Sequence, residues 1–234
     1  MSSIRDHFNA SGEEALRGLT GPAAHLHYAE YILGQIDAPE GARVLDVGCG
    51  DGAVLAAVRT LRPDLECVGV DFADAQIERA RAVHGHRPGL EFAVRDVNRE
   101  AMELGAFDRL YSFSVIQFFS SAEFGLVCRR LQPSLRAGGR IAHLSIPDLR
   151  KRAIMFQDSF LNERQCGPAA AWLHTQKMLL VDLKRRLIGD RRYGSDSHYH
   201  DAEELARLCR PDFDARIVRP SDSWYRFDLH LTAR

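Results

Sequence analysis

Residues 42–52 read Ala-Arg-Val-Leu-Asp-Val-Gly-Cys-Gly-Asp-Gly, and this stretch decides the fold. Val44, Leu45 and Val47 give the near-continuous apolar run of a parallel strand that is covered on both faces. Three glycines follow at alternate positions, and they allow the backbone to turn tightly against a ligand. The stretch therefore predicts a buried strand that runs into a ligand-binding loop.

Two interpretations of the loop are open, and Asp46 at the strand tip bears on both. A glycine loop that opens a helix is usually a pyrophosphate site, because free helix amides and the positive helix end favour anions. The spacing Gly48-x-Gly50-x-x-Ala53 also satisfies the dinucleotide fingerprint. Asp46 and Asp51 fit poorly with pyrophosphate, and they favour a ligand that presents an ammonium or a sulfonium group.

The nonapeptide 44–52 resembles the first motif of the class I S-adenosylmethionine-dependent methyltransferases. The resemblance implies that the glycine loop, with Gly48, Cys49 and Gly50, packs against the methionine part of S-adenosylmethionine. It also implies that Asp46 helps to hold the amino group of that cofactor. The resemblance extends motif by motif over residues 41–146.

The next two strands end at positions that match the same family. Asp71 closes the short apolar strand 67–71, about 20 residues beyond the loop, where nucleotide-binding sheets place the carboxylate that binds the ribose hydroxyls. The resemblance implies that Phe72 packs on the adenine, that Asp96 meets the adenine amino group and that the amide of Val97 meets the ring. A helix N-cap, a core aromatic and a turn residue are the ordinary alternatives for Asp71, Phe72 and Asp96.

The fourth strand, residues 107–113, continues through Ser-Val-Ile-Gln at 114–117. Family members that methylate adenine amines or glutamine amides typically carry an Asn/Asp-Pro-Pro-Tyr/Phe motif at this place, and this chain does not. The departure argues against those two acceptors. The resemblance still places the backbone around Phe113 and Ser114 at the methionine end of the cofactor.

Five strands alternate with helices up to residue 146, and a pair of strands closes the chain. We therefore predict an α/β fold: a doubly wound, Rossmann-like, seven-stranded methyltransferase sheet with a C-terminal antiparallel hairpin strand, N-terminal helices and a helical insert. The expected single domain comprises an N-terminal helical cap at 1–40, a cofactor-binding core at 41–146, a substrate-side insert at 147–200, and a final helix and hairpin at 201–234.

The insert carries an excess of arginine and lysine and a predicted helix at about 169–187. Arginine forks such as those of Arg150 and Arg152 would suit an anionic acceptor, although such a charge run is usually a solvated helix face. His143, near the end of the fifth strand, and His198, in the loop after the insert, are the candidate bases for a hydroxyl acceptor. The alternatives are a satisfied core histidine for His143 and an exposed loop position for His198.

Composition sets outer limits on the function. The 234 residues carry a formal net charge of −1, which argues against general nucleic-acid binding. Five scattered cysteines predict neither a disulfide framework nor a metal site. The chain start lacks an apolar signal core, and no run approaches the roughly 20 apolar residues of a membrane helix. We expect a soluble, cytoplasmic protein without a membrane partner.

Together these features predict an enzyme that transfers a methyl group from S-adenosylmethionine to a small-molecule acceptor. A hydroxyl or carboxylate on a sugar-like or natural-product substrate is the expected target, and the basic insert would suit an anionic acceptor. Three alternatives stay open. They are an RNA or protein methyltransferase, a nicotinamide-dependent oxidoreductase, and a cofactor-binding module without chemistry.

Overall fold

The computed structural model describes residues 21–100, 102, 104–151, 172–173, 176–177, 179–180, 183, 192–193, 197–220 and 226–234. Residues 1–20 of the expected N-terminal helical cap, most of the insert and Arg152 lie outside the described residues. One of the expected N-terminal helices is present as α2 (Pro22–Ile36). Among the described residues, no helix is both long and apolar enough to cross a bilayer.

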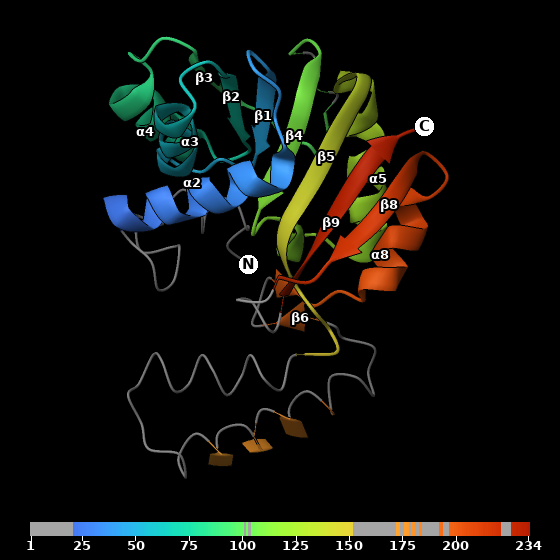
Figure 1. Ribbon diagram of the computed structural model, residues 1–234. Coiled ribbons are helices and arrows are strands. Elements are labelled where there is room, and N and C mark those ends of the chain that lie inside the picture. The colour runs from blue at the N-terminus through green and yellow to red at the C-terminus, as the bar shows by residue number, and fades with distance from the viewer. Residues whose placement is uncertain are drawn as a thin grey trace.

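Seven strands form one sheet in the order β3-β2-β1-β4-β5-β9-β8 (Figure 1). β9 runs antiparallel to both of its neighbours, β5 and β8, whereas the other pairs are parallel. The predicted sheet and its closing hairpin are therefore confirmed. The bounds are β1 (Arg43–Val47), β2 (Glu66–Asp71), β3 (Leu90–Val94), β4 (Phe107–Phe113), β5 (Leu135–Pro147), β8 (Phe213–Val218) and β9 (Arg226–Ala233).

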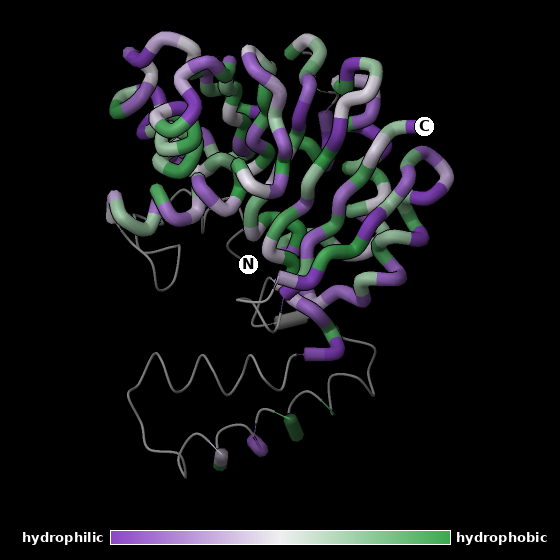
Figure 2. Tube along the Cα trace, viewed as in Figure 1, coloured by the Kyte–Doolittle hydropathy of each residue, from purple (hydrophilic) through white to green (hydrophobic). Residues whose placement is uncertain are grey.

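Helices cover both faces of the sheet, as its buried strands require. Successive side chains of a strand point to opposite faces, so Val44 packs in the core under α2, α3 and α4, and Leu45 packs in the core under α5 and α8. Hydrophobic stretches accordingly gather along the strands in the middle of the molecule, and hydrophilic stretches lie in the loops at its periphery (Figure 2). The remaining elements are α3 (Ala53–Leu61), α4 (Asp74–His84), η2 (Ile116–Phe118), α5 (Ser121–Leu131), η3 (Gln132–Ser134), β6 (Arg192–Tyr193), β7 (Ser197–His198) and α8 (Ala202–Cys209).

Local sequence explains where two of the helices begin. The Ser120 hydroxyl accepts a hydrogen bond from the Glu123 amide, and the Glu123 carboxylate accepts one from the Ser120 amide, which completes the predicted capping box of α5. Asp201 caps α8 by accepting hydrogen bonds from the amides of Glu203 and Glu204. These caps fix the start of the two helices on the α5/α8 face.

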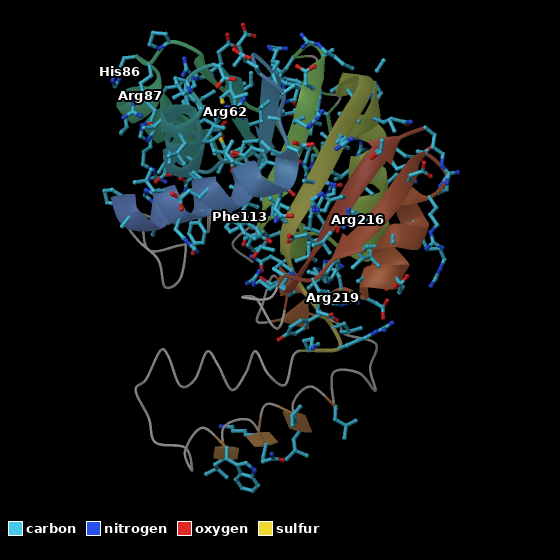
Figure 3. All side chains as sticks on the ribbon, viewed as in Figure 1. Arg62, His86, Arg87, Phe113, Arg216 and Arg219 are labelled. Atoms are coloured by element: carbon cyan, nitrogen blue, oxygen red, sulfur yellow. The ribbon has the colours of Figure 1, made fainter. Side chains whose placement is uncertain are left out.

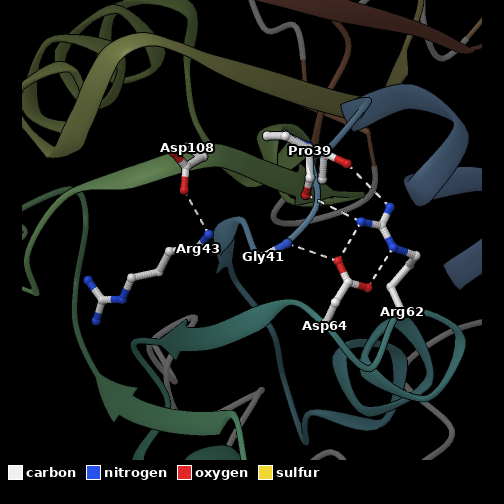
Figure 4. Close-up of polar contacts among 7 residues, drawn as sticks. Pro39, Gly41, Arg43, Arg62, Asp64 and Asp108 are labelled. Carbon is white, nitrogen blue, oxygen red and sulfur yellow. Dashed lines mark hydrogen bonds and ion pairs between the residues drawn. The ribbon is translucent and has the colours of Figure 1, made fainter.

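A clamp of polar side chains holds the amino edge of the sheet, where α2 connects to β1 (Figure 4). The Arg62 guanidinium donates to both carboxylate oxygens of Asp64 and to the carbonyls of Ala38 and Pro39. Asp64 also accepts a hydrogen bond from the Gly41 amide at 3.0 Å. The paired guanidinium and these hydrogen bonds hold the pKa of Asp64 below its usual range.

Candidate functional site

The glycine loop follows β1 at the opposite, carboxyl edge of the sheet, the edge at which open α/β sheets bind ligands. Gly48 and Gly50 have φ angles of +83° and +55°, which glycine adopts without strain. A Cβ atom on Gly48 would lie 2.5 Å from a Val115 methyl carbon, whereas one on Gly50 would meet nothing within 4 Å. The loop is thus packed at Gly48 and open at Gly50, where a ligand could approach the backbone.

Asp71, the last residue of β2, organises the open part of this loop. Its carboxylate accepts hydrogen bonds from the Gly50 amide at 3.0 Å and from the Ala73 amide at 2.9 Å. The first bond fixes the loop, and the second is an Asx-turn contact ahead of α4. Ala73 is the N-cap of α4 and no side chain caps that helix, so Asp71 is not the helix N-cap of the ordinary alternative.

Asp46 is buried beside Asp71, with only 4% of its surface exposed. The Tyr111 hydroxyl donates a hydrogen bond of 2.9 Å to its carboxylate. Burial, with a smaller contribution from the charge of Asp71, raises the pKa of Asp46 to about 7 despite the Tyr111 hydrogen bond, which lowers it. Within the described part of the chain, no lysine or arginine makes an ion pair with Asp46. A bound cation would lower this pKa and stabilise the carboxylate.

The thiol of Cys49 lies in the same electrostatic environment as Asp46. Burial raises its pKa well above the usual value, and the carboxylates of Asp46, Asp71 and Asp51 add to the effect. Each of these effects disfavours a further negative charge in the loop. The loop is therefore better suited to a cationic ligand than to a pyrophosphate.

The carboxyl ends of β2 and β3 bring the remaining predicted cofactor residues to the same edge. Phe72 follows β2 directly and is half-buried. Asp96 follows β3, accepts a hydrogen bond from the Asn98 amide at 3.1 Å and pairs with Arg99 at 3.4 Å. Val97 is buried in the core. Because β1, β2 and β3 are neighbours in the sheet, these residues line one continuous edge with the glycine loop.

Phe113 and Ser114 end β4, the neighbour of β1 on its other side. Ser114 has a φ angle of +58°, which is strained for a residue other than glycine. Its amide donates a hydrogen bond of 3.0 Å to the Leu144 carbonyl, and its own carbonyl accepts one from the Gln117 side chain. The strained turn leaves the Phe113 ring 4.9 Å from the Tyr28 ring of α2.

Comparison with known proteins agrees with this geometry. Residues 44–139 match the model of a family described as a methyltransferase domain. Over this part of the chain, the match supports the expected resemblance to the class I S-adenosylmethionine-dependent methyltransferases. The matched range contains the glycine loop and every predicted cofactor residue from Asp46 to Ser114.

Two curated relatives and one solved structure show how far the likeness extends. A malonyl-[acyl-carrier protein] O-methyltransferase of Legionella pneumophila is 32% identical over 110 residues, which cover 47% of this chain and 38% of the relative. A trans-aconitate 2-methyltransferase of Variovorax paradoxus is 30% identical over 123 residues, covering 53% of this chain and 45% of the relative. This chain therefore spans less than half the length of either relative.

The solved structure supports the fold of the whole chain. The crystal structure of magnesium protoporphyrin IX methyltransferase from Synechocystis PCC 6803, with bound S-adenosylhomocysteine, superposes with a TM-score of 0.63. The match covers 99% of this chain and 98% of that chain at 15% sequence identity. At this low identity the comparison shows the methyltransferase fold alone.

His143 occupies the core of this methyltransferase fold, with 1% of its surface exposed. Its Nδ1 lies 2.9 Å from the Ser112 hydroxyl, its Nε2 lies 3.6 Å from the Cys128 sulfur, and the Phe124 ring packs edge-on against it. Burial, with a smaller contribution from His230, lowers the pKa of His143 to about 3. This is the environment of a satisfied core histidine, so we assign no proton-transfer role to His143.

His198 lies instead at the insert base, by which we mean residues 147–151 and 197–201. It is half-buried, and its ring centroid is 6.3 Å from that of His200. The His200 backbone pairs with Pro147 and Leu149, and its Nε2 lies 3.1 Å from the Ile116 carbonyl. The two ends of the insert are thus joined to each other and to η2, and His198 is not the exposed loop residue of the alternative interpretation.

Arg150 differs from its expected role as an anion-binding residue. Its Nε and Nη2 atoms donate to the Asp201 carboxylate at 3.0 and 2.9 Å. The guanidinium thereby links the start of the insert to the N-cap of α8. The pairing gives this arginine a structural role, so it adds no specific support to an anionic acceptor.

Sequence reasoning missed several partners at the carboxyl edge. Tyr111 pairs in register with Asp46 across β1 and β4, and a strand alignment would have been needed to find it. Asp228, fully buried in β9, accepts hydrogen bonds from Tyr31 and from the Ser145 amide. No local motif marks that contact, because the partners lie far apart in the sequence.

Proposed function

We propose that this chain transfers a methyl group from S-adenosylmethionine to an oxygen atom of a small-molecule acceptor. The observation that carries the proposal is the acidic glycine loop, in which Asp46 is buried beside Asp71 and the backbone is open at Gly50. Paired carboxylates around an open backbone suit a ligand with an ammonium and a sulfonium group. They do not suit the pyrophosphate of a nicotinamide cofactor, which is the rival for this loop.

The residues of the edge fit the parts of the proposed cofactor. Gly48, Cys49 and Gly50 would hold the methionine part, and Asp46 would act on its ammonium group. Phe72, Asp96 and the Val97 amide would surround the adenine. Asp71 would bind the ribose hydroxyls and keep the loop amide of Gly50 in place. Phe113 and Ser114 would border the methionine end.

When bound, S-adenosylmethionine supplies a methyl group that is already activated on a sulfonium. The chain is left with the tasks of alignment, exclusion of water and electrostatic discrimination. Asp46 and Asp71 attract a cationic cofactor more strongly than the less positive product of methyl transfer. Their charges therefore favour binding before the reaction and release after it.

Two observations favour an oxygen acceptor on a small molecule. The turn after β4 lacks the Asn/Asp-Pro-Pro motif, and the Legionella relative is named an O-methyltransferase. A hydroxyl acceptor must lose its proton, and His198 is the proposed base because it is half-buried at the carboxyl edge. An ionised carboxylate acceptor would need no base.

Thermal unfolding with ligands tests the cofactor assignment. S-adenosylhomocysteine at 100 times its dissociation constant should stabilise the protein by about 2.7 kcal/mol, whereas NAD should not stabilise it. Asp71→Asn should bind S-adenosylhomocysteine at least about tenfold more weakly, because the ribose and Gly50 contacts both lose charge. Asp74→Asn, at an exposed aspartate that begins α4, is the matched control. Stabilisation by NAD alone would establish the oxidoreductase alternative instead.

A further inference from the structure

A fully buried carboxylate connects three parts of the acceptor side. Asp228 of β9 is 0% exposed. Its Oδ1 accepts a hydrogen bond of 2.8 Å from the Ser145 amide, and its Oδ2 accepts one from the Tyr31 hydroxyl of α2. Burying a carboxylate is costly unless donors surround it. The donors come here from a helix and a strand that are distant in sequence, so Asp228 fixes their relative position.

The strand contact is itself unusual. Ser145 has a φ angle of +61°, and the pairing of β5 with β9 shifts its register between His143 and Ile146. The Arg226 guanidinium donates a hydrogen bond of 2.6 Å to the Ser145 carbonyl, so the residue is held on both sides. Strained residues of this kind persist only where the surroundings impose them, and they concentrate at functional sites. The irregularity bends β5 where the acceptor edge begins.

The helix contact positions a set of aromatic rings at the same edge. The Tyr31 ring lies edge-on to the Phe113 ring, with centroids 6.3 Å apart, and the Tyr28 ring is tilted against Phe113 with centroids 4.9 Å apart. All three residues are half-buried, so each keeps part of its surface accessible. Phe113 ends β4 next to α2, beside the proposed methionine end of the cofactor (Figure 3). We call these three residues the aromatic wall.

We propose, on the basis of the proposed function, that the aromatic wall lines the acceptor subsite and that this subsite takes a planar aromatic acceptor. Asp228 is the positioning residue that holds the rings of the wall in place. Aromatic rings attract one another in tilted and offset arrangements beyond the effect of buried area alone. A flat acceptor ring can make such contacts with Phe113 and Tyr28. Asp228 contributes by holding Tyr31, and with it α2, at a fixed distance from β4.

This subsite favours a ring over a strongly anionic acceptor. Arg150, the basic residue expected to bind an anion, is already paired with Asp201. A neutral ring with a hydroxyl group therefore suits the described residues better than a polycarboxylate. The hydroxyl would be the group that receives the methyl.

Two probes that differ only in aromaticity test the wall. The protein, saturated with S-adenosylhomocysteine, is titrated by calorimetry with 2-naphthol and with decahydro-2-naphthol. The saturated probe is at least as hydrophobic, so a merely apolar pocket would bind it as well or better. We expect 2-naphthol to bind about tenfold more tightly, which is the size of one aromatic pair. Equal affinity, or no binding of 2-naphthol, overturns the proposal.

Variants locate the probe and isolate the role of Asp228. Tyr28→Leu should abolish the preference for 2-naphthol, and Tyr28→Phe, the matched control, should keep it. Tyr31→Phe keeps the ring but removes the hydrogen bond to Asp228, and it should reduce the preference about threefold with unchanged affinity for S-adenosylhomocysteine. Asp228→Asn should do the same if it folds. An unchanged preference in Tyr31→Phe contradicts the positioning role.

The two proposals fail in distinguishable ways. If S-adenosylhomocysteine does not bind, the proposed function fails. The preference for 2-naphthol over decahydro-2-naphthol is then measured by titrating the protein without S-adenosylhomocysteine. If S-adenosylhomocysteine binds and the preference is absent, only the aromatic acceptor class is lost.

Discussion

Two aspartates at opposite edges of the same sheet have opposite electrostatic environments. Asp64, at the amino edge, is paired with Arg62, and the pKa of its carboxyl lies below the usual range. Asp46, at the carboxyl edge, is buried against a tyrosine and near Asp71, and its pKa is raised to about 7. The first carboxylate has its cation within the chain. The second has the properties of a group whose cation arrives as a ligand.

The two edges also differ in how they are held. At the amino edge, side chains bond to the carbonyls of Ala38 and Pro39. Backbone in the left-handed region occurs at both edges, at Asp37 and Gly41 on the amino side and at the loop glycines, Ser114 and Ser145 on the carboxyl side. The cost in folding free energy that distinguishes the carboxyl edge, where function is proposed, is therefore its destabilised carboxylate.

Replacing Asp46 by asparagine should give the largest effect. The folded-state pKa of about 7 lies above the ordinary value of 3.8, so the stability from this group is present below pH 3.8 and is lost as the pH rises through 7. The shift corresponds to roughly 4 kcal/mol at most. Asp46→Asn should therefore gain unfolding free energy relative to the natural protein as the pH is raised from 5 to 8. Urea unfolding at both pH values measures the difference.

A second variant checks that the effect belongs to the Asp46 carboxylate. Tyr111→Phe removes the hydrogen bond that lowers the Asp46 pKa, so it should steepen the loss of stability with pH. Asp46→Asn should also weaken S-adenosylhomocysteine binding even though it stabilises the free protein. If the difference in unfolding free energy between the natural protein and Asp46→Asn does not change with pH, the proposed contrast between Asp46 and Asp64 is wrong.

Two alanine substitutions in the loop should separate folding from binding. Gly48→Ala places a methyl group 2.5 Å from a Val115 carbon at a φ of +83°, and it should cost roughly 2–4 kcal/mol of unfolding free energy. Gly50→Ala meets no atom within 4 Å and should cost only about 1–2 kcal/mol. Its methyl group would nevertheless enter the proposed cofactor space and weaken S-adenosylhomocysteine binding more than tenfold. Denaturation and calorimetry measure the two quantities, and an unaffected affinity in Gly50→Ala would place the ligand elsewhere.

The features that could be predicted from the sequence are local or periodic. The strand at 43–47, the loop glycines and the acids after β2 and β3 each lie within a short stretch, and the closing hairpin follows from its alternation. The sequence also specified the capping box of α5. Each of these features depends on residues within a few positions of each other.

The features that escaped prediction depend on contacts between distant segments. Tyr31 and Asp228 are 197 residues apart, and Ser145 and Asp228 are 83 apart, so no local pattern indicates their hydrogen bonds. His143 fitted two interpretations equally, and only its burial between Ser112 and Cys128 separates them. The pairing of Arg150 with Asp201 likewise depends on how the insert base closes.

The smallest expected effect is at Asp64, which tests the same contrast with Asp46 at the amino edge of the sheet. The lowered pKa means that the stability from this carboxylate is present above pH 3.8 and is lost as the pH falls below it, the reverse of Asp46. The Arg62 pair is partly exposed, so salt screens it and side-chain entropy offsets much of its attraction. Asp64→Asn should therefore lower the thermal midpoint slightly at pH 7, and less in 1 M NaCl. Asp64→Ala, which also loses the acceptor for the Gly41 amide, should lower it more. A gain of stability at high pH in Asp64→Asn, matching that of Asp46→Asn, would show that the two edges do not differ in the way their carboxylates are paired.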